Sequence, residues 1–292
     1  MIEIVPCKER FDELVQFVAH LNRDGEHHIG FFGEGEADIR ASLAECLIPP
    51  SEGFTMAYDG DQLVGVFGVD ADSEIDRAWL FGPLVGHADW HDVADQLYAK
   101  VLPRIPVGIR DYDLFCDVQN THMEAFAVRH GFPLHSENAV LILRRENYQS
   151  SAKRKSRIIP YQKRFFSKFE KMHKDLFPNG YFTARQMVEK RDENHQLFLA
   201  VEDRQLLGYH FCKIEPDSES AYVDFIGTDP SARGRGIGAD LLASGVEWML
   251  SAPTTKKINL TVNADNVIAR RLYETFGFVT DRIMRGYRKR VL

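Results

Sequence analysis

The chain is an internal duplication, and this repeat constrains its fold more than any single motif does. The segment Ala57–Gly65 (AYDGDQLVG) recurs as Ala200–Gly208 (AVEDRQLLG), and Gly131-Phe132 recurs as Gly277-Phe278. Two copies of one pattern predict two domains of the same fold, and 292 residues are enough for both. We therefore expect a first domain over residues 1–146, a linker over residues 147–157 and a second domain over residues 158–292.

Hydrophobic periodicity predicts the same order of elements in each copy. A short strand and two helices lead into a hairpin, for which Asp59-Gly60 indicates a type I′ turn in the first copy. A fourth strand enters a long helix, and a fifth strand, another helix and a closing hairpin complete the copy. This order predicts an α/β (α+β) fold with a mixed, mostly antiparallel twisted sheet flanked by helices. In the second copy the last four elements before the hairpin are expected at Ala221–Thr228, Gly238–Leu250, Lys257–Val262 and Ala264–Phe276.

Composition indicates a cytoplasmic globular protein. Hydrophobic residues make up 44% of the chain, yet no apolar run approaches the 18 residues of a membrane span, and no signal peptide is evident. The four cysteines are far apart without a C-x-x-C pair, which favours reduced thiols over disulfides or zinc. His87 and His91 lack a further ligand, so we expect no metal. The cysteines are Cys7, Cys46, Cys116 and Cys212.

The net charge of −7 is divided unevenly along the chain. Residues 1–146 carry 11 Lys and Arg against 26 Asp and Glu, whereas residues 147–292 are net basic. Halves of opposite sign support two domains and make the second one better suited to an anionic ligand. Its basic residues are dispersed and no aromatic residues are interleaved with them, so nucleic-acid binding is not expected.

A glycine-rich loop follows the fourth strand of the second copy. Arg233–Gly238 (RGRGIG) holds three glycines, so several backbone N–H groups can face one point. The N-terminus of the following helix adds its own N–H groups and positive dipole end, and the two arginines add charge at the rim. The loop lacks both the Gly-Lys-Ser/Thr ending of a P-loop and the Gly-x-Gly-x-x-Gly of a Rossmann turn. It predicts a phosphate cradle of another kind; the alternative is a solvated surface turn.

Two motifs resemble one family. Arg-x-x-Gly-x-Gly after Thr228-Asp229-Pro230 resembles the pyrophosphate loop of the GCN5-related N-acetyltransferase (GNAT) superfamily. Asn263–Phe278 contains that family's Asn-x-x-Ala-x-x-Leu-Tyr-x-x-x-Gly-Phe pattern. The resemblance implies two tandem GNAT-like domains, each with a central parallel strand pair that separates after a bulge to admit pantetheine. It further implies acetyl-CoA as cosubstrate and acetyl transfer to a primary amine of a small molecule or peptide.

The resemblance also implies residue roles. Backbone groups near Gly227 would bind pantetheine, backbone groups of the glycine-rich loop would bind the pyrophosphate, and Asn266 would either cap its helix or contact the pantetheine amide. Tyr273 matches the family's general acid near the sulfur; the alternative is a core aromatic. The residues expected at the cofactor are Ile226, Gly227, Thr228, Arg233, Gly234, Arg235, Gly236, Ile237, Gly238 and Asn266.

Asp224 is the outlier in an otherwise apolar strand. Strict alternation would place it on one face with Tyr222, Ile226 and Thr228. Three roles stay open for this carboxylate: a general base, an anchor for a cationic amine, or a core carboxylate paired with an arginine. No cysteine matches a nucleophile, so direct transfer in a ternary complex is preferred to an acyl-enzyme.

The first copy has the pattern of a degenerate domain. Where the second copy has its loop, the first has Gly86–Ala94, which lacks the glycines and places Asp89 and Asp92 where they would repel a pyrophosphate. Ala127 stands at the position of Tyr273. We therefore expect one acetyl-CoA site per chain; the alternative is that the first half binds acyl-CoA through other contacts.

The first copy also carries 11 extra residues, which we place in Gly25–Gly35. Its glycines and aromatic residues suggest a mobile flap, with which the acidic half would wall the acceptor site and steer a cationic amine; solubility alone is the alternative explanation of the charge. Two rival functions remain: a non-catalytic acyl-CoA sensor or scaffold, and transfer of a longer acyl group. The sequence leaves monomer and homodimer open.

Overall fold

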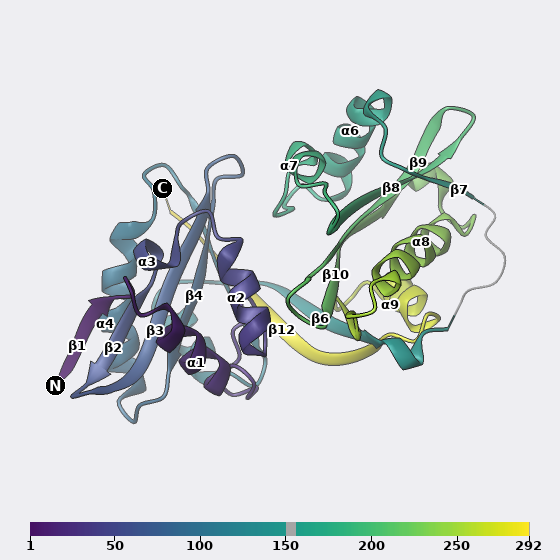
Figure 1. Cartoon of the computed structure of the whole chain (residues 1–292). Coiled ribbons are helices and arrows are strands. Elements are labelled where there is room, and N and C mark those ends of the chain that lie inside the picture. Colours follow the sequence, from purple (N-terminus) through teal and green to yellow (C-terminus); the bar gives the residue numbers. More distant parts are fainter. Residues whose placement is uncertain (150–155, 292) are drawn as a thin grey trace. The chain divides into compact units, whose positions relative to one another are not determined.

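The computed structural model describes residues 1–149 and 156–291, so residues 150–155 of the expected linker lie outside it. The chain forms two compact units (Figure 1). Unit 1 consists of Met1–Asn138 and Arg282–Leu292, and unit 2 consists of Ala139–Asp281. This division differs from the boundary expected near residue 146, because the last segment of each half belongs to the unit built mainly by the other half.

In unit 1 the strand order is β1-β2-β3-β4-β5-β12. Neighbours are antiparallel except β4 and β5, which are parallel. The strands are β1 (Ile2–Pro6), β2 (Thr55–Asp59), β3 (Gln62–Asp72), β4 (Arg77–Val85), β5 (Asp111–Asp117) and β12 (Val279–Arg290), of which β12 enters unit 1 at Arg282. The helices are α1 (Phe11–Leu21), α2 (Glu36–Ala44), α3 (Pro50–Gly53), α4 (Trp90–Val101) and α5 (Thr121–Arg129), with the 3₁₀ turn η1 (Leu102–Arg104).

In unit 2 the order is β6-β11-β10-β9-β8-β7, with β10 and β11 parallel. The strands are β6 (Leu134–Arg144, entering unit 2 at Ala139), β7 (Arg157–Pro160), β8 (His195–Glu202), β9 (Gln205–Ile214), β10 (Ser220–Thr228) and β11 (Lys257–Asn263). The helices are α6 (Phe166–Leu176), α7 (Ala184–Glu189), α8 (Ile237–Ser251) and α9 (Val267–Glu274), with 3₁₀ turns at Arg145–Asn147, Lys163–Phe165 and Pro230–Ala232. Helices flanking a mixed, mostly antiparallel sheet with a parallel pair confirm the expected fold class.

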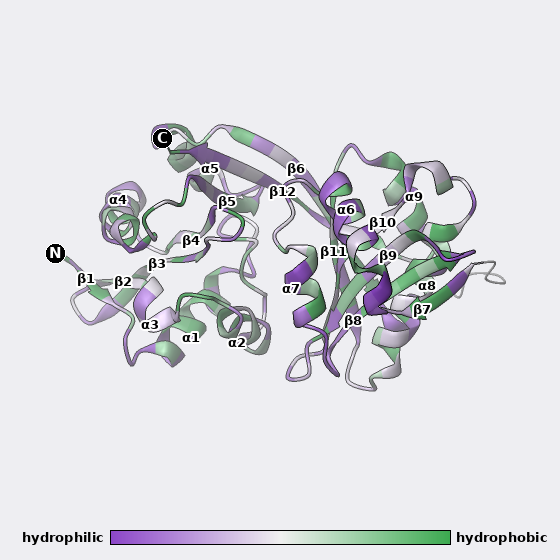
Figure 2. Cartoon of the chain, turned by 90° about the horizontal axis from the view of Figure 1, so that it is seen from above, coloured by the Kyte–Doolittle hydropathy of each residue, from purple (hydrophilic) through white to green (hydrophobic). Residues whose placement is uncertain are grey.

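Helices cover both faces of the unit 2 sheet (Figure 1). On one face α6 and α7 pack Phe169 and Met187 against residues of β8 and β9 such as Leu199. On the other face α8 packs Ile237 and Leu241 against the sheet. Figure 2 shows α8 as largely apolar, in keeping with its buried position. The sheet is therefore enclosed between layers, and ligands can reach it only where strands separate or end.

Each half ends on one long strand that pairs in the other unit, so the expectation of a closing hairpin in each copy is wrong. Hydrophobic periodicity predicts that these segments are strands but does not predict which strands they pair with. In unit 2, the first half's Arg145 donates from Nε to the carbonyl of Thr255 (2.8 Å) and from Nη2 to those of Leu250 (2.8 Å) and Ala252 (2.6 Å).

Charge complementarity accompanies the pairing of β12 in unit 1. Arg288 binds both carboxylate oxygens of Asp113 on β5, at 2.6 and 2.7 Å. Arg285 donates to Glu124 at 3.1 Å. The opposite charges of the two sequence halves therefore partly reflect a basic C-terminal strand bound to an acidic unit, in addition to any anionic ligand.

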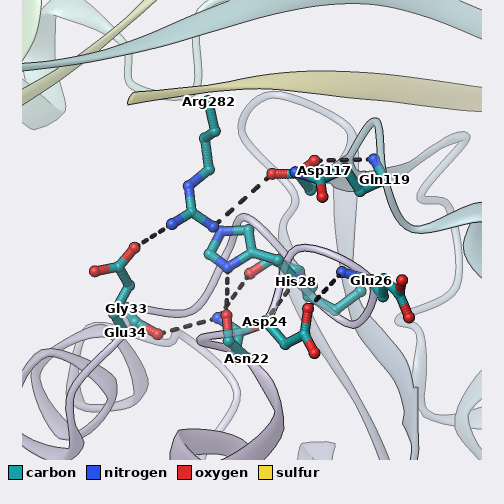
Figure 3. Close-up of polar contacts among 10 residues, drawn as sticks. Asn22, Asp24, Glu26, His28, Gly33, Glu34, Asp117, Gln119 and Arg282 are labelled. Carbon is teal, nitrogen blue, oxygen red and sulfur yellow. Dashed lines mark hydrogen bonds and ion pairs between the residues drawn. The ribbon is translucent and has the colours of Figure 1, made fainter. Parts of the chain in front are cut away.

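Segment Gly25–Gly35 is packed into unit 1, so the expectation of a mobile flap is wrong. Ile29 is fully buried and Phe32 is 5% exposed, both within the core cluster of unit 1. The side chain of Asn22 donates to the carbonyls of Ile29 (3.2 Å) and Gly33 (3.1 Å) and accepts from the amide of Ile29 (2.6 Å) (Figure 3). Buried apolar side chains and satisfied backbone groups hold the segment in place.

The first hairpin turns at Gly60-Asp61, and of these two residues only Gly60 has a positive φ. The expected type I′ turn at Asp59-Gly60 is therefore wrong, because type I′ needs positive φ at both central residues. The second hairpin does meet that requirement, at Asp203 (φ 45°) and Arg204 (φ 62°). Pairing register, set by the strands' buried faces, decides where each turn lies.

Within residues 1–149 and 156–291, no helix combines the length and the apolar character needed to cross a membrane. In the same part of the chain, no three or more His, Cys, Asp or Glu residues gather as metal ligands.

Candidate functional site

β10 and β11 begin as a parallel pair and then separate. They pair from Ser220 with Lys257 to Val223 with Leu260, whereas β10 continues to Thr228 paired with β9 alone. A register shift against β9 lies between Val223 and Phe225, so Asp224 sits in a bulge where the separation begins. Beyond it, the β11-facing edge of β10 has no strand partner in the described part of the chain. An extended ligand could bind that edge as an added strand does.

The bulge also changes which side chains share a face. Tyr222 pairs with Lys213, and its ring centroid lies 5.2 Å from the Lys213 ammonium. Phe225 pairs with Phe211, which lies on the same face of β9 as Lys213, towards α6. Ile226 packs on the opposite side with Ile237 of α8. The expected grouping of Tyr222 with Ile226 is therefore wrong, because one inserted residue reverses the alternation.

The loop after β10 has a backbone preformed for an anion. The Asp229 carboxylate accepts from the Ser231 amide (2.8 Å) and hydroxyl (2.6 Å), and these bonds lower its pKa. Gly234 (φ 75°) and Gly236 (φ 85°) adopt left-handed conformations, and no atom lies within 4 Å of where a Cβ would be on either residue. Gly236 is the N-cap of α8 and no side chain caps this helix. The first-turn amides of α8 are thus left to water or to an anionic ligand.

The three side chains of this loop have different roles. Arg235 is paired with a carboxylate, because its Nη2 donates to both carboxylate oxygens of Glu202, at 2.8 and 2.6 Å. Ile237 is 3% exposed and packs under α8, so only its backbone is available to a ligand. Arg233 is exposed and contributes to the low pKa of Asp229. Two arginines were expected at the rim of the loop. Among the described residues, Arg235 forms a salt bridge and Arg233 does not.

Three motifs meet around Gly238 at the start of α8. A Cβ at this position would lie 3.4 Å from Leu272 of α9 and 3.8 Å from the methyl group of Thr228 on β10. Gly227 has a different reason for its lack of side chain: a Cβ there would lie 2.7 Å from Leu176 and 3.2 Å from Tyr209, both on the α6 face. Gly227 therefore serves packing beneath α6. The structure brings the strand end, the loop and the α9 motif together.

Tyr273 lies on α9 directly after Leu272. It is 6% exposed, its ring packs against Phe278 at 5.8 Å, and burial raises its pKa to about 12. No described residue hydrogen-bonds its hydroxyl, although the ring is enclosed. Asn266 caps α9, accepting from the Ala269 amide at 3.1 Å, so this cap is present whatever further contact the residue makes. Tyr273 is thus packed as a core aromatic, and none of the described residues shown in contact with it bonds to its hydroxyl.

The carboxylate of Asp224 is oriented by a residue that the sequence analysis missed. The Tyr181 hydroxyl donates to Asp224 Oδ1 at 2.8 Å, and the Tyr181 ring packs on Phe225 at 4.6 Å. Tyr181 lies in the loop between α6 and α7 and is 38% exposed. Two successive aromatic residues after a glycine, Gly180-Tyr181-Phe182, were the available signal in the sequence. Asp224 therefore has an aromatic and hydroxyl-bearing environment at the point where β10 and β11 separate.

Other titratable groups nearby are poorly suited to nucleophilic or basic roles. Burial, followed by the charge of Asp224, raises the pKa of Cys212 well above its usual value. Burial lowers the pKa of His210 to about 4 and also lowers that of His173. Both His173 ring nitrogens are engaged, one with the Tyr209 hydroxyl (2.6 Å) and one with the Phe182 carbonyl (2.8 Å). Direct transfer stays favoured over a cysteine acyl-enzyme.

Unit 1 lacks the corresponding cradle. At the equivalent helix α4 the N-cap is Asp89, and Trp90 at the first position is 5% exposed and stacked on His122 at 5.1 Å. No residue from Gly86 to Val93 has a positive φ. Ala127, at the position of Tyr273, is fully buried. The helix start that is open to an anion in unit 2 is thus closed here by an aromatic side chain and carries a carboxylate.

Comparison with known proteins agrees with this geometry. Residues 161–278 match the model of the acetyltransferase (GNAT) family. A mycothiol acetyltransferase of Mycobacterium avium (strain 104) is 35% identical over 127 residues, which cover 37% of this chain and 40% of that relative. The match thus spans less than half the length of the relative.

Two solved structures resemble the whole chain. One is a tandem GNAT protein from the clavulanic acid biosynthesis pathway, solved without AcCoA (TM-score 0.69, 14% identity, 99% of this chain and 98% of that one). The other is a GCN5-related N-acetyltransferase from Sphaerobacter thermophilus (TM-score 0.71, 12% identity, 99% and 95%). At these identities the likeness concerns the fold.

Proposed function

We propose that this protein is an acetyl-CoA-dependent N-acetyltransferase, because residues 161–278 match the model of the GNAT acetyltransferase family and the whole chain resembles a tandem GNAT protein in fold. Its catalytic site lies in unit 2 and its acceptor is a primary amine. The observation that carries the proposal is the uncapped start of α8 beside the separated strands β10 and β11. An anionic head and an extended arm would find complementary backbone groups there.

The roles of the cofactor-binding residues follow from their backbone. Amides from Arg233 to Gly238 would bind the pyrophosphate, with Arg233 adding positive charge. The open edge of β10 from Ile226 to Thr228 would bind the pantetheine arm. Asp224 lies four residues before Thr228, about 13 Å along the strand at about 3.3 Å per residue. The cosubstrate supplies an acetyl thioester, whose reacting end we place near Asp224.

Tyr273 would stabilise the departing sulfur. With a pKa of about 12, its phenol is fully protonated at neutral pH and able to donate. A thiol has an ordinary pKa of about 8.5, well below that of this phenol, so complete proton transfer from the phenol to the departing sulfur would be uphill. We therefore assign Tyr273 the role of a hydrogen-bond donor to the developing thiolate. Such a donor contributes most in the transition state, where the charge appears.

Asp224 and Tyr181 would receive the amine. An alkyl ammonium with a pKa near 10 must bind and then lose a proton before it can attack. The Asp224 carboxylate can attract the cation, and the hydrogen bond from Tyr181 fixes its orientation. The ring of Tyr181, which is 38% exposed and packs on Phe225, adds a face on which a cation is favoured. Between the three roles considered for Asp224, this environment favours the cation anchor, with proton removal as a second task.

Calorimetry with coenzyme A and a turnover screen test the proposal together. We expect one binding site per chain and thiol release from acetyl-CoA with at least one primary amine of a panel containing polyamines, amino sugars and peptides. The corresponding alcohols serve as controls and should give no release above hydrolysis. Binding without turnover of any amine would instead support an acyl-CoA sensor. A higher kcat/KM with a longer acyl-CoA than with acetyl-CoA would show that the enzyme transfers a longer acyl group.

A further inference from the structure

Unit 1 retains the separating strand pair although it lacks the anion cradle. β4 and β5 pair in parallel only from Arg77 with Asp111 to Trp79 with Asp113. Both strands then continue, β4 to Val85 and β5 to Asp117. A register shift of β4 against β3 follows further along, between Phe81 and Leu84, whereas the bulge of β10 lies directly at the separation in unit 2. Unit 1 therefore has a gap between β4 and β5 at the place where unit 2 has its open edge.

The chain itself occupies this gap. β12 pairs with one edge of β5 along its whole length, so the edge that β4 leaves is the opposite one. Ile29 forms an antiparallel bridge with Cys116 on β5. The Gly30 amide donates to the Phe115 carbonyl (2.8 Å), and the Asp117 amide donates to the His28 carbonyl (3.1 Å). Residues 28–30 thus act as a short strand on the vacated edge.

Aromatic side chains from the same segment fill the space between the two strands. The Phe31 ring lies 5.4 Å from that of Phe81 on β4 and 5.8 Å from that of Phe115 on β5. Phe32 packs edge-on to Phe81 at 5.2 Å and contacts Phe54 at 6.2 Å. An arm lying between β4 and β5 would have to displace these rings.

The glycines of the segment allow this close approach. A Cβ on Gly30 would lie 2.4 Å from the Phe115 ring and 2.6 Å from Met284. A Cβ on Gly33 would lie 2.2 Å from the Asp38 side chain. Gly35, in contrast, has only ordinary contact, with Asp38 Oδ2 at 3.7 Å. Gly30 and Gly33 are therefore required by packing.

Polar contacts with two other elements hold the segment in place (Figure 3). Asn22 at the end of α1 makes the three hydrogen bonds to Ile29 and Gly33 described above. Next to Gly33, the side chain of Glu34 pairs with Arg282 of β12, which also lies 3.9 Å from Asp117. These anchors come from helix α1 and the C-terminal strand, so the segment is held across unit 1.

We propose that Gly25–Gly35 is an internal ligand of unit 1, which fills the gap between β4 and β5 and keeps that unit folded without a cofactor. The insertion in Gly25–Gly35 and the missing anion cradle then have one explanation. In unit 1 a segment of the chain fills the gap between the two strands, whereas in unit 2 the pantetheine arm of the cosubstrate is proposed to fill the corresponding gap. The comparison with unit 2 rests on the proposed function. The occupancy of the unit 1 gap does not.

Residue-resolved hydrogen exchange on the full-length protein tests the proposal. We expect slow exchange at the amides of Gly30 and Asp117, unchanged by saturating acetyl-CoA, while amides of residues 234–238 slow at least tenfold. Acceleration or slowing at Gly30 or Asp117 by acetyl-CoA would overturn the proposal, as would exchange there at the rate of an unstructured peptide. If acetyl-CoA changes neither region, the proposed function fails and the internal ligand stands.

A matched pair of variants provides a second readout. The Cβ of Gly30→Ala would clash with the Phe115 ring, whereas the Cβ of Gly35→Ala would make only an ordinary contact. Gly30→Ala should therefore speed hydrogen exchange at the Asp117 amide at least tenfold, and Gly35→Ala less than threefold. Equal effects of the two would refute close packing of the segment on β5. If Gly30→Ala does not fold, Asn22→Ala compared with Gln16→Ala, at an exposed position of α1, replaces it, with the same expectation.

Discussion

Replacing Gly236 by glutamate places a negative charge at the start of α8, where the pyrophosphate is proposed to bind. Gly236 has a φ of 85°, and no atom lies within 4 Å of the position that a Cβ would take, so the new side chain has room. The left-handed backbone costs about 1–2 kcal/mol of folding stability for a residue with a side chain. The effect on binding is therefore expected to be electrostatic rather than steric.

The size of that effect follows from Coulomb's law. Two unit charges about 5 Å apart repel by about 3 kcal/mol at an effective dielectric constant of about 20, appropriate near a protein surface. The glutamate also opposes the positive end of the α8 dipole, which corresponds to about half a charge. Since about 1.4 kcal/mol is a factor of ten in affinity, the Kd for coenzyme A should rise about 100-fold.

Calorimetry with coenzyme A measures this directly, and Gly236→Asn is the matched control. Asparagine tolerates the left-handed conformation and is neutral, so its Kd should stay within about fivefold of the wild type. The difference in Kd between the glutamate and asparagine variants should become smaller at high salt, because salt screens an exposed charge beyond about 10 Å at 0.1 M ionic strength. Both variants should keep the wild-type melting temperature to within a few degrees.

Three outcomes would contradict a single pyrophosphate site at the start of α8. A Kd within threefold of the wild type for Gly236→Glu would mean that the phosphates do not lie at this helix start. Equal losses for the glutamate and asparagine variants would assign the effect to the backbone. Two binding sites in the wild-type titration would mean that unit 1 also takes up the ligand.

Tyr273→Phe should lower kcat about 100-fold or more and leave the Kd for acetyl-CoA within twofold, because only the hydroxyl is lost; an unchanged kcat would leave Tyr273 with a packing role alone. Burial raises the pKa of Tyr273 to about 12, so its hydroxyl keeps its proton at all lower pH values. Below pH 10 the pH profiles of kcat for the wild type and for Tyr273→Phe should therefore have the same shape. Asp224→Asn should raise KM for the amine more than tenfold with little effect on acetyl-CoA binding, which steady-state kinetics with each substrate varied would show. Arg145→Met removes a side chain that donates to three carbonyls in unit 2 and should lower stability by about 2–4 kcal/mol in urea denaturation. For an amine substrate, kcat/KM should fall as salt rises if charge steers it; Glu34 is a poor probe of this because it pairs with Arg282.

Some features were predictable because their cause is local in the sequence. The glycine spacing in Arg233–Gly238 predicts left-handed turns wherever the loop lies, and Gly234 and Gly236 adopt them. Helix α8 (Ile237–Ser251) extends one residue beyond each end of the predicted Gly238–Leu250, because its apolar residues recur at helical spacing. The repeat predicted two units of one fold, and the whole chain matches the fold of a solved tandem GNAT protein.

Other features depend on contacts between residues far apart in the chain. The bulge at Asp224 reverses the faces of Tyr222 and Ile226, and no local pattern marks it. Tyr181 meets Asp224 only because the loop between α6 and α7 folds over β10. The role of Tyr181 therefore had to come from the structure.

The sequence by itself determined the duplication, the order of strands and helices, and the glycine-rich loop, since periodicity and backbone freedom are properties of short segments. Tertiary structure decided that β12 completes unit 1, where Arg288 finds Asp113, and that Gly25–Gly35 fills a gap rather than moving over a site. The physical reason is the same in both cases. A strand edge or an apolar gap accepts whichever compatible segment reaches it, and long-range pairing and packing, which local sequence does not encode, decide which segment that is.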